Sequence, residues 1–305
     1  MLAPFFCLTC ASVKPGAPAT KDAAAGGGGA ATDATGAVDV VVAIDRPAID
    51  LAPGERPPPA PGKVYAHSAD TLYLLEPISK QVTTVGTFDC TGSMVDIAID
   101  RTGRMTGSAA ISFNGGLGGA LVSVDSTNAH CQVLNRGANL VTSLTYVPEG
   151  TLVANAEALV GYADDRYVRL DPTTGSLTDL GPLNNAASGG TTWISSGDVV
   201  SIKDGGTYLT VKPSTGAIAG GDRIVEVDPR TGALKRIIGP TGSDDVLGLG
   251  YWGGIAYGFT IAGTLIQINL TTGAGSPIPI PGAAATPDLS FLGAGTTTVA
   301  PIIVE

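Results

Sequence analysis

The stretch DRIVEVDPRTGALKRIIG, residues 222–239, decides the predicted fold. Residues 223–228 alternate polar and β-branched apolar side chains, a pattern typical of a strand with one buried face. Residues 228–232 then supply a turn, because proline presets φ, the aspartate can bond the backbone and glycine accepts a left-handed conformation. Residues 233–238 return as a second strand. The whole stretch therefore predicts a β-hairpin.

The same hairpin is repeated along the chain. Its turn marker recurs at intervals of 41 to 57 residues, at Glu76, Asp125, Asp171, Asp228 and Asn269. A second strand pair lies between consecutive hairpins and is clearest in VLGLGYWGGIAYGFT, residues 246–260. Four strands per repeat and a period in the forties match the blade of a propeller. We predict an all-β fold, a β-propeller of five four-stranded blades, with an irregular sixth blade left open.

The two ends of the repeat region predict how the ring closes. KVYAHS, residues 63–68, aligns with the second strand of a blade that lacks its first strand. Residues 288–295 resemble a first strand that no hairpin follows. We expect the C-terminal strand to complete the blade that begins at Lys63, which would leave no exposed sheet edge at the junction.

Composition agrees with this class and excludes others. The 305 residues include 43 Gly and 21 Pro, only 14% are charged, and long apolar stripes at helical spacing are absent. The net charge is −10, and the 17 basic residues are scattered. Nucleic-acid binding requires clustered Lys and Arg, so we do not expect it.

The N-terminal part predicts export and tethering. Residues 1–12, MLAPFFCLTCAS, resemble the end of a bacterial secretion signal with a lipobox, in which Cys10 would be lipidated; an ordinary frayed terminus is the alternative. Residues 13–62 are rich in Ala, Gly and Pro and predict a disordered linker. Residues 63–305 would form the propeller. The expected location is extracytoplasmic, in the cell envelope, the periplasm or on the outer surface.

Cysteine positions predict one disulfide. Cys7 and Cys10 belong to the leader, whereas Cys90 and Cys131 fall on one blade. In an oxidising compartment their pairing would add about 3 kcal/mol of stability by restricting the unfolded chain. Two inert buried thiols are the alternative.

One candidate site is a ring of polar residues at the starts of the inner strands. Alignment of the repeats places five of them at nearly equivalent positions: Asp96, Asn139, Asp198, Asp245 and Asp288. Crowded carboxylates would bind a cation such as calcium or have raised pKa values. The alternative is that each side chain bonds backbone N–H groups of the incoming loop.

Aromatic residues form a second candidate site. Trp193 falls in a predicted loop, and Tyr251 and Trp252 end a predicted inner strand, where they could stack on a sugar or a peptide or pack in the core. We expect no transition-metal site, because His67 and His130 are placed away from predicted inner strands and no metal-spaced pair remains outside the leader. No G-x-S-x-G motif is present, and no other cofactor is expected.

The repeated pattern of an apolar strand, D-P-x-T-G and G-L-G-Y-W-G-G-I-A-Y-G-F resembles bacterial extracytoplasmic β-propellers, particularly uncharacterised lipoprotein-like propellers of myxobacteria. The resemblance implies a secreted domain that is often membrane-anchored. We therefore predict a monomeric, non-enzymatic binding module or scaffold that presents loops to a protein, peptide or glycan. A glycoside-acting or metal-assisted hydrolase that uses the acidic ring is the alternative.

Overall fold

The structure is a computed structural model that describes residues 62–90, 92–113, 116–280 and 289–303. The predicted leader, the linker, the lipidation site Cys10 and the ring position Asp288 lie outside these residues. All of the described residues belong to one compact unit, Pro53–Glu305.

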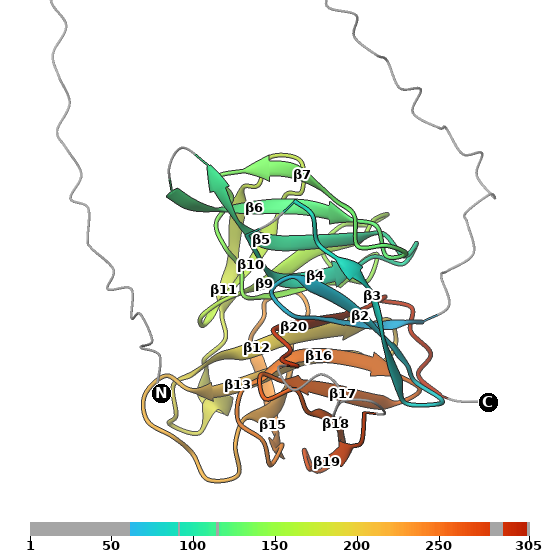
Figure 1. The fold of residues 1–305 in the computed structure, drawn as a ribbon. Coiled ribbons are helices and arrows are strands. Elements are labelled where there is room, and N and C mark those ends of the chain that lie inside the picture. Colours follow the sequence, from blue (N-terminus) through green and yellow to red (C-terminus); the bar gives the residue numbers. More distant parts are fainter. Residues whose placement is uncertain (1–61, 91, 114–115, 281–288, 304–305) are drawn as a thin grey trace, which may run out of the picture. The chain divides into compact units, whose positions relative to one another are not determined.

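In the described part of the chain, twenty strands form five antiparallel sheets of four strands each, which are the five blades of a β-propeller (Figure 1). The inner strands of the five blades contact one another around the centre. From the inner to the outer strand, the first blade consists of β20 (Gly293–Thr296), β1 (Val64–His67), β2 (Thr71–Glu76) and β3 (Gln81–Thr87). The second consists of β4 (Ser93–Ile99), β5 (Met105–Phe113), β6 (Gly116–Val124) and β7 (Cys131–Arg136).

The third blade consists of β8 (Ser143–Val147), β9 (Ala158–Ala163), β10 (Arg166–Leu170) and β11 (Leu177–Pro182). The fourth consists of β12 (Trp193–Ile202), β13 (Gly206–Pro213), β14 (Arg223–Val227) and β15 (Leu234–Pro240). The fifth consists of β16 (Val246–Trp252), β17 (Ile255–Thr260), β18 (Leu265–Ile268) and β19 (Gly275–Ile278). The predicted fold class and number of blades are confirmed.

Ring closure by the two ends of the domain is also confirmed. β20 pairs antiparallel with β1, in a register that places Thr296 opposite Val64 and Gly293 opposite His67. The first blade thus combines one strand from the C-terminal end of the sequence with three from the N-terminal end of the repeats. The inner edge of β1 is consequently covered.

The turns form as the sequence predicts. In the hairpin β14–β15 the Asp228 carboxylate accepts hydrogen bonds from the N–H groups of Arg230 and Thr231, at 2.7 and 3.2 Å, and Gly232 adopts a φ of 69°. Asn269 makes the same two side-chain bonds in the hairpin β18–β19. These local bonds explain why the turn chemistry could be recognised from sequence.

Helical structure in the described residues is limited to one 3₁₀ turn, Ala186–Ser188, which Asn185 caps. Within this part of the chain, no helix has the length and apolar character needed to cross a membrane. Apolar side chains fill the spaces between neighbouring blades, so the core is distributed around the ring.

Candidate functional site

Two aspartates at the centre of the ring gather backbone amides from all five inner strands. Asp96 on β4 accepts two of these hydrogen bonds, and Asp198 on β12 accepts three. The donors to Asp96 are the N–H groups of Ile97 and Leu144, at 2.9 and 2.5 Å. The donors to Asp198 are the N–H groups of Val199, Leu249 and Ala294, at 2.6, 2.7 and 3.2 Å. Each inner strand therefore contributes one amide to the pair.

Both side chains are fully buried, with an exposure of 0%. Desolvation raises the pKa of each carboxyl well above its usual range, and the charge of Asp198 raises the pKa of Asp96 further. The interaction between the two carboxyl groups lowers the pKa of Asp198 and raises that of Asp96. Burial and the neighbouring carboxyl group thus both favour the protonated form of Asp96.

His67 lies beside this pair at the end of β1. Its Nδ1 donates to the carbonyl of Ser68 at 2.8 Å, and its Nε2 lies 3.8 Å from Asp96 Oδ1 without a hydrogen-bond partner. Burial lowers the pKa of His67 to about 4, so the ring is neutral at neutral pH. The sequence predicted that His67 lies away from the inner strands. Its position beside β20 and Asp96 follows from ring closure, which joins residues far apart in the sequence.

The predicted acidic ring is therefore only partly assembled. Asn139 is exposed in the connection that precedes β8, and Asp245 is half-exposed before β16, where its carboxylate lies 3.6 Å from Lys212 Nζ. Of the ring positions that the structure describes, Asp96 and Asp198 are the two that lie together. Their oxygens are buried and accept amide hydrogens.

The aromatic candidates do not form an exposed platform. The sequence predicted that Trp193 lies in a loop, but it is the first residue of β12. Its side chain is 3% exposed, and its Nε1 donates to the carbonyl of Ser188 at 3.2 Å. Tyr251 is buried between blades. Trp252 is half-buried and packs against the core between the fifth and first blades.

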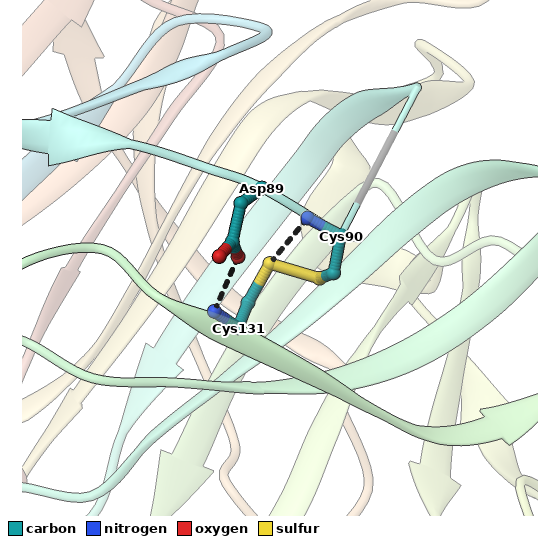
Figure 2. A group of neighbouring side chains, drawn as sticks. All are labelled: Asp89, Cys90 and Cys131. Carbon is teal, nitrogen blue, oxygen red and sulfur yellow. Dashed lines mark hydrogen bonds between the residues drawn. A yellow bond between two sulfur atoms is a disulfide. The ribbon is translucent and has the colours of Figure 1, made fainter.

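The predicted disulfide between Cys90 and Cys131 is confirmed (Figure 2). It joins the segment before β4 to the first residue of β7, with a Cα–Cα distance of 5.5 Å. Asp89 supports the link, because its carboxylate accepts the Cys131 N–H at 2.9 Å and contacts His130 Nδ1 at 2.6 Å. Because both sulfur atoms are part of the disulfide bond, the oxidised cysteines do not provide thiolate ligands for a metal ion.

Three adjoining hollows open where the inner strands end. Their volumes are about 440, 240 and 240 Å³. Pro148, Glu149 and Lys203 line both the first and the second hollow, and Arg101, Glu149 and Glu157 line both the second and the third. Lys203 follows β12 directly, and Pro148 follows β8 directly. The hollows thus form one polar recess, which we call the axial recess.

Opposite charges are held close together in the axial recess. Arg101 Nη1 lies 2.6 Å from Glu149 Oε2, and the Arg101 N–H donates to Glu157 Oε2 at 2.8 Å. Thr298 donates its hydroxyl to the other oxygen of Glu157. Partial burial raises the pKa of Glu157. Lys203 and Arg230 form no ion pair among the described residues, and Arg230 Nη2 donates to the carbonyl of Gly150 at 3.4 Å.

Sequence reasoning missed the axial recess. Its residues share one detectable property: Arg101, Glu149 and Lys203 are charged and come within two residues of the end of an inner strand. In a propeller such positions meet at one face around the axis. This signal could be read only after the inner strands had been assigned.

The fold and the recess define this protein as a five-bladed β-propeller with a closed centre. No protein-family model matches the sequence, and the comparison with curated proteins gives no match either. A protein of unknown function from Bacteroides caccae is similar in structure, with a TM-score of 0.41 and 10% identity over 78% of this chain and 99% of that one.

Two other solved structures show a comparable degree of similarity. An oligogalacturonate lyase in complex with manganese gives a TM-score of 0.38 and 10% identity, with 70% of this chain and 60% of that chain covered. BamB from Moraxella catarrhalis gives a TM-score of 0.31 and 13% identity, with 71% and 69% covered. Likeness at this level carries no functional argument, and the fold rests on the strand pairings themselves.

Proposed function

We propose that this protein is a non-enzymatic, extracytoplasmic binding propeller that holds a protein or peptide partner in the axial recess. The supporting observation is the continuity of the three hollows around a centre that is itself closed. A ligand is bound preferentially in a concave site with a few convergent polar groups. The recess offers such groups from three blades.

The chemistry of the recess favours a peptide segment over a glycan. Cations that lack an ion-pair partner, Lys203 and Arg230, occur there beside the acidic groups Asp204 and Glu157. Side chains and backbone of a polar peptide can satisfy both signs. Tyr146 is the aromatic residue among the lining positions, and it is largely buried, so the recess provides no broad aromatic face for a sugar ring.

The proposed location and tether rest on separate features. A disulfide between Cys90 and Cys131 is typical of an oxidising compartment. Lipidation of Cys10 would anchor the domain to a membrane and remains part of the proposal. The hydrolase alternative has no support at the acidic ring, because Asp96 and Asp198 are inaccessible.

The proposed function is tested by affinity capture from an envelope fraction with three versions of the full chain. The double variant Lys203→Glu/Arg230→Glu reverses the two cations that lack an ion-pair partner, and recovery of a specific partner should fall at least about tenfold, as expected for a loss of more than 1.4 kcal/mol of binding free energy.

Lys212→Glu is the matched control. Lys212 lies opposite Ile194, at the far end of the fourth blade from Lys203, and its ion pair with Asp245 is exposed. This control should recover the partner as the wild type does. Equal recovery by all three proteins would reject the axial recess as the binding site.

A further inference from the structure

We propose that Asp96 and Asp198 form a proton-sharing clasp that locks the ring, and that loss of the shared proton loosens the closing strand β20. The clasp divides the inner strands into two groups. Asp198 links β12 to β16 and β20 through the amides of Leu249 and Ala294. Asp96 links β4 to β8 through the amide of Leu144. A proton shared by the two carboxyl groups joins these two groups of strands across the centre.

A bond between the two carboxyl groups requires one proton. Two ionised carboxylates offer only acceptors, so they cannot hydrogen-bond each other. The five backbone amides are divided between the two carboxyl groups and supply only partial positive charge, and the strands bring no full positive charge. Lysine and arginine are absent from β1 and from all five inner strands. A second negative charge at 0% exposure would therefore repel the first without compensation.

Other titratable groups around the clasp do not replace the proton. His67 faces Asp96 from β1, but its pKa of about 4 keeps it neutral at and above neutral pH. Tyr146 on β8 and Tyr251 on β16 have raised pKa values because of burial. β20 contributes no titratable residue. Above pH 7, the clasp is accordingly the group at the centre whose proton can be lost.

Closing strand β20 depends on the clasp at a defined point. Its four residues pair with β1 on one side, and the N–H of Ala294 bonds Asp198 on the other. Ionisation of Asp96 removes the donor to Asp198 and places two like charges next to Ala294. The expected response is an outward displacement of β20 at Ala294, while the pairing with β1 and the hydrogen bond from the Tyr251 N–H to Thr296 Oγ1 hold the rest of the strand.

The pH dependence of unfolding tests the clasp. In the unfolded chain both aspartates titrate near pH 3.9 and hold no proton at pH 7, whereas the folded pair holds one. Folding therefore takes up a proton, and the unfolding constant should rise with pH above 7, by up to tenfold per pH unit, until the folded pKa is passed. The side-chain amide introduced by Asp96→Asn can donate to Asp198 but cannot titrate. In this variant, the unfolding constant should therefore rise less steeply with pH above 7 than in the wild type.

Asp222→Asn is the matched control. Asp222 is also buried and accepts a backbone amide, from Val246 at 2.9 Å, but its pKa is about 6 and it lies outside the clasp. It should therefore keep the wild-type slope above pH 7. Equal slopes for the wild type and Asp96→Asn would overturn the proposal.

A spectroscopic measurement on the wild type keeps the test decisive if Asp96→Asn does not fold. Carboxyl ¹³C resonances of labelled aspartate should show one buried group still protonated at pH 7. In hydrogen exchange corrected for intrinsic rates, the Ala294 amide should lose protection when that group ionises. Two ionised carboxylates at pH 7, or an Ala294 amide that stays protected through the ionisation, would overturn the proposal.

Discussion

Gly293 occupies a tightly enclosed position beside the clasp. A Cβ atom there would lie 2.3 Å from His67 Nε2 and 2.4 Å from Asp96 Oδ1, both of which belong to buried side chains. Gly293→Ala should therefore lower the free energy of unfolding by about 1–3 kcal/mol or more, as overpacking of a dense core does. Urea unfolding at pH 7 measures the change.

Gly116→Ala is the control for this substitution, because no atom lies within 4 Å of the added Cβ and the residue is exposed. Its unfolding midpoint should stay close to that of the wild type. If Gly293→Ala also left the midpoint unchanged, the centre would have room that the structure does not show, and the contact between His67, Asp96 and β20 would be refuted.

The residues of the clasp illustrate what sequence could and could not predict. Asp96 and Asp198 were recognised as inner-strand acids, because alignment of the repeats places each at the start of an inner strand. Their role in binding amides from other blades depends on contacts between residues 48 to 96 positions apart, which no local pattern encodes. The sequence alone therefore did not show whether these acids face an open channel or a closed centre.

At the scale of the strand, regular hairpins were predictable and irregular inner strands were not. The turn after β14 forms through bonds within five residues, so its sequence determines it locally. By contrast, the pairing of inner strands with their neighbours shifts register between Met94 and Asp96, and again between Ser195 and Val199. The sequence alignment assigned Asn139 and Asp245 to the ring, although the residues that precede the donor amides in their blades are Ser143 and Gly248.

The link between β7 and the segment before β4 makes a prediction about one blade. Its disulfide spans 41 residues, and a native disulfide of this span adds about 2–4 kcal/mol, mainly by restricting the unfolded chain. Cys90→Ser/Cys131→Ser should therefore unfold at a lower urea concentration while keeping the wild-type far-ultraviolet circular dichroism spectrum. An unchanged midpoint would mean that the link contributes nothing to the stability of the second blade.

At the scale of the whole molecule, the residues that close the ring are different from the residues of the axial recess. The centre is sealed by five amides and two carboxyl groups, and the axial recess lies where the inner strands end and connecting segments begin. Loops can vary in charge without disturbing the clasp, because Lys203 and Arg230 are not among its partners. In the proposed function, this division would let a chain with a buried acidic pair present both signs of charge to a partner.

Closure by β20 gives the last prediction. A chain that stops after Ile280 lacks β20, so β1 would expose its inner edge and Asp198 would lose the Ala294 amide. Buried Phe291, which packs between Tyr73 and Phe259, would also be removed. We expect this chain to lose cooperative thermal unfolding and to associate through its open edge, as measured by calorimetry and gel filtration.

A synthetic peptide of residues 289–303 should restore the cooperative transition, because it supplies the missing strand. A control chain that stops after Ile302 keeps every strand and should behave as the full protein does. If the shorter chain unfolded cooperatively at the wild-type temperature, the ring would not depend on its terminal strand, and both the closure and the clasp would need a different account.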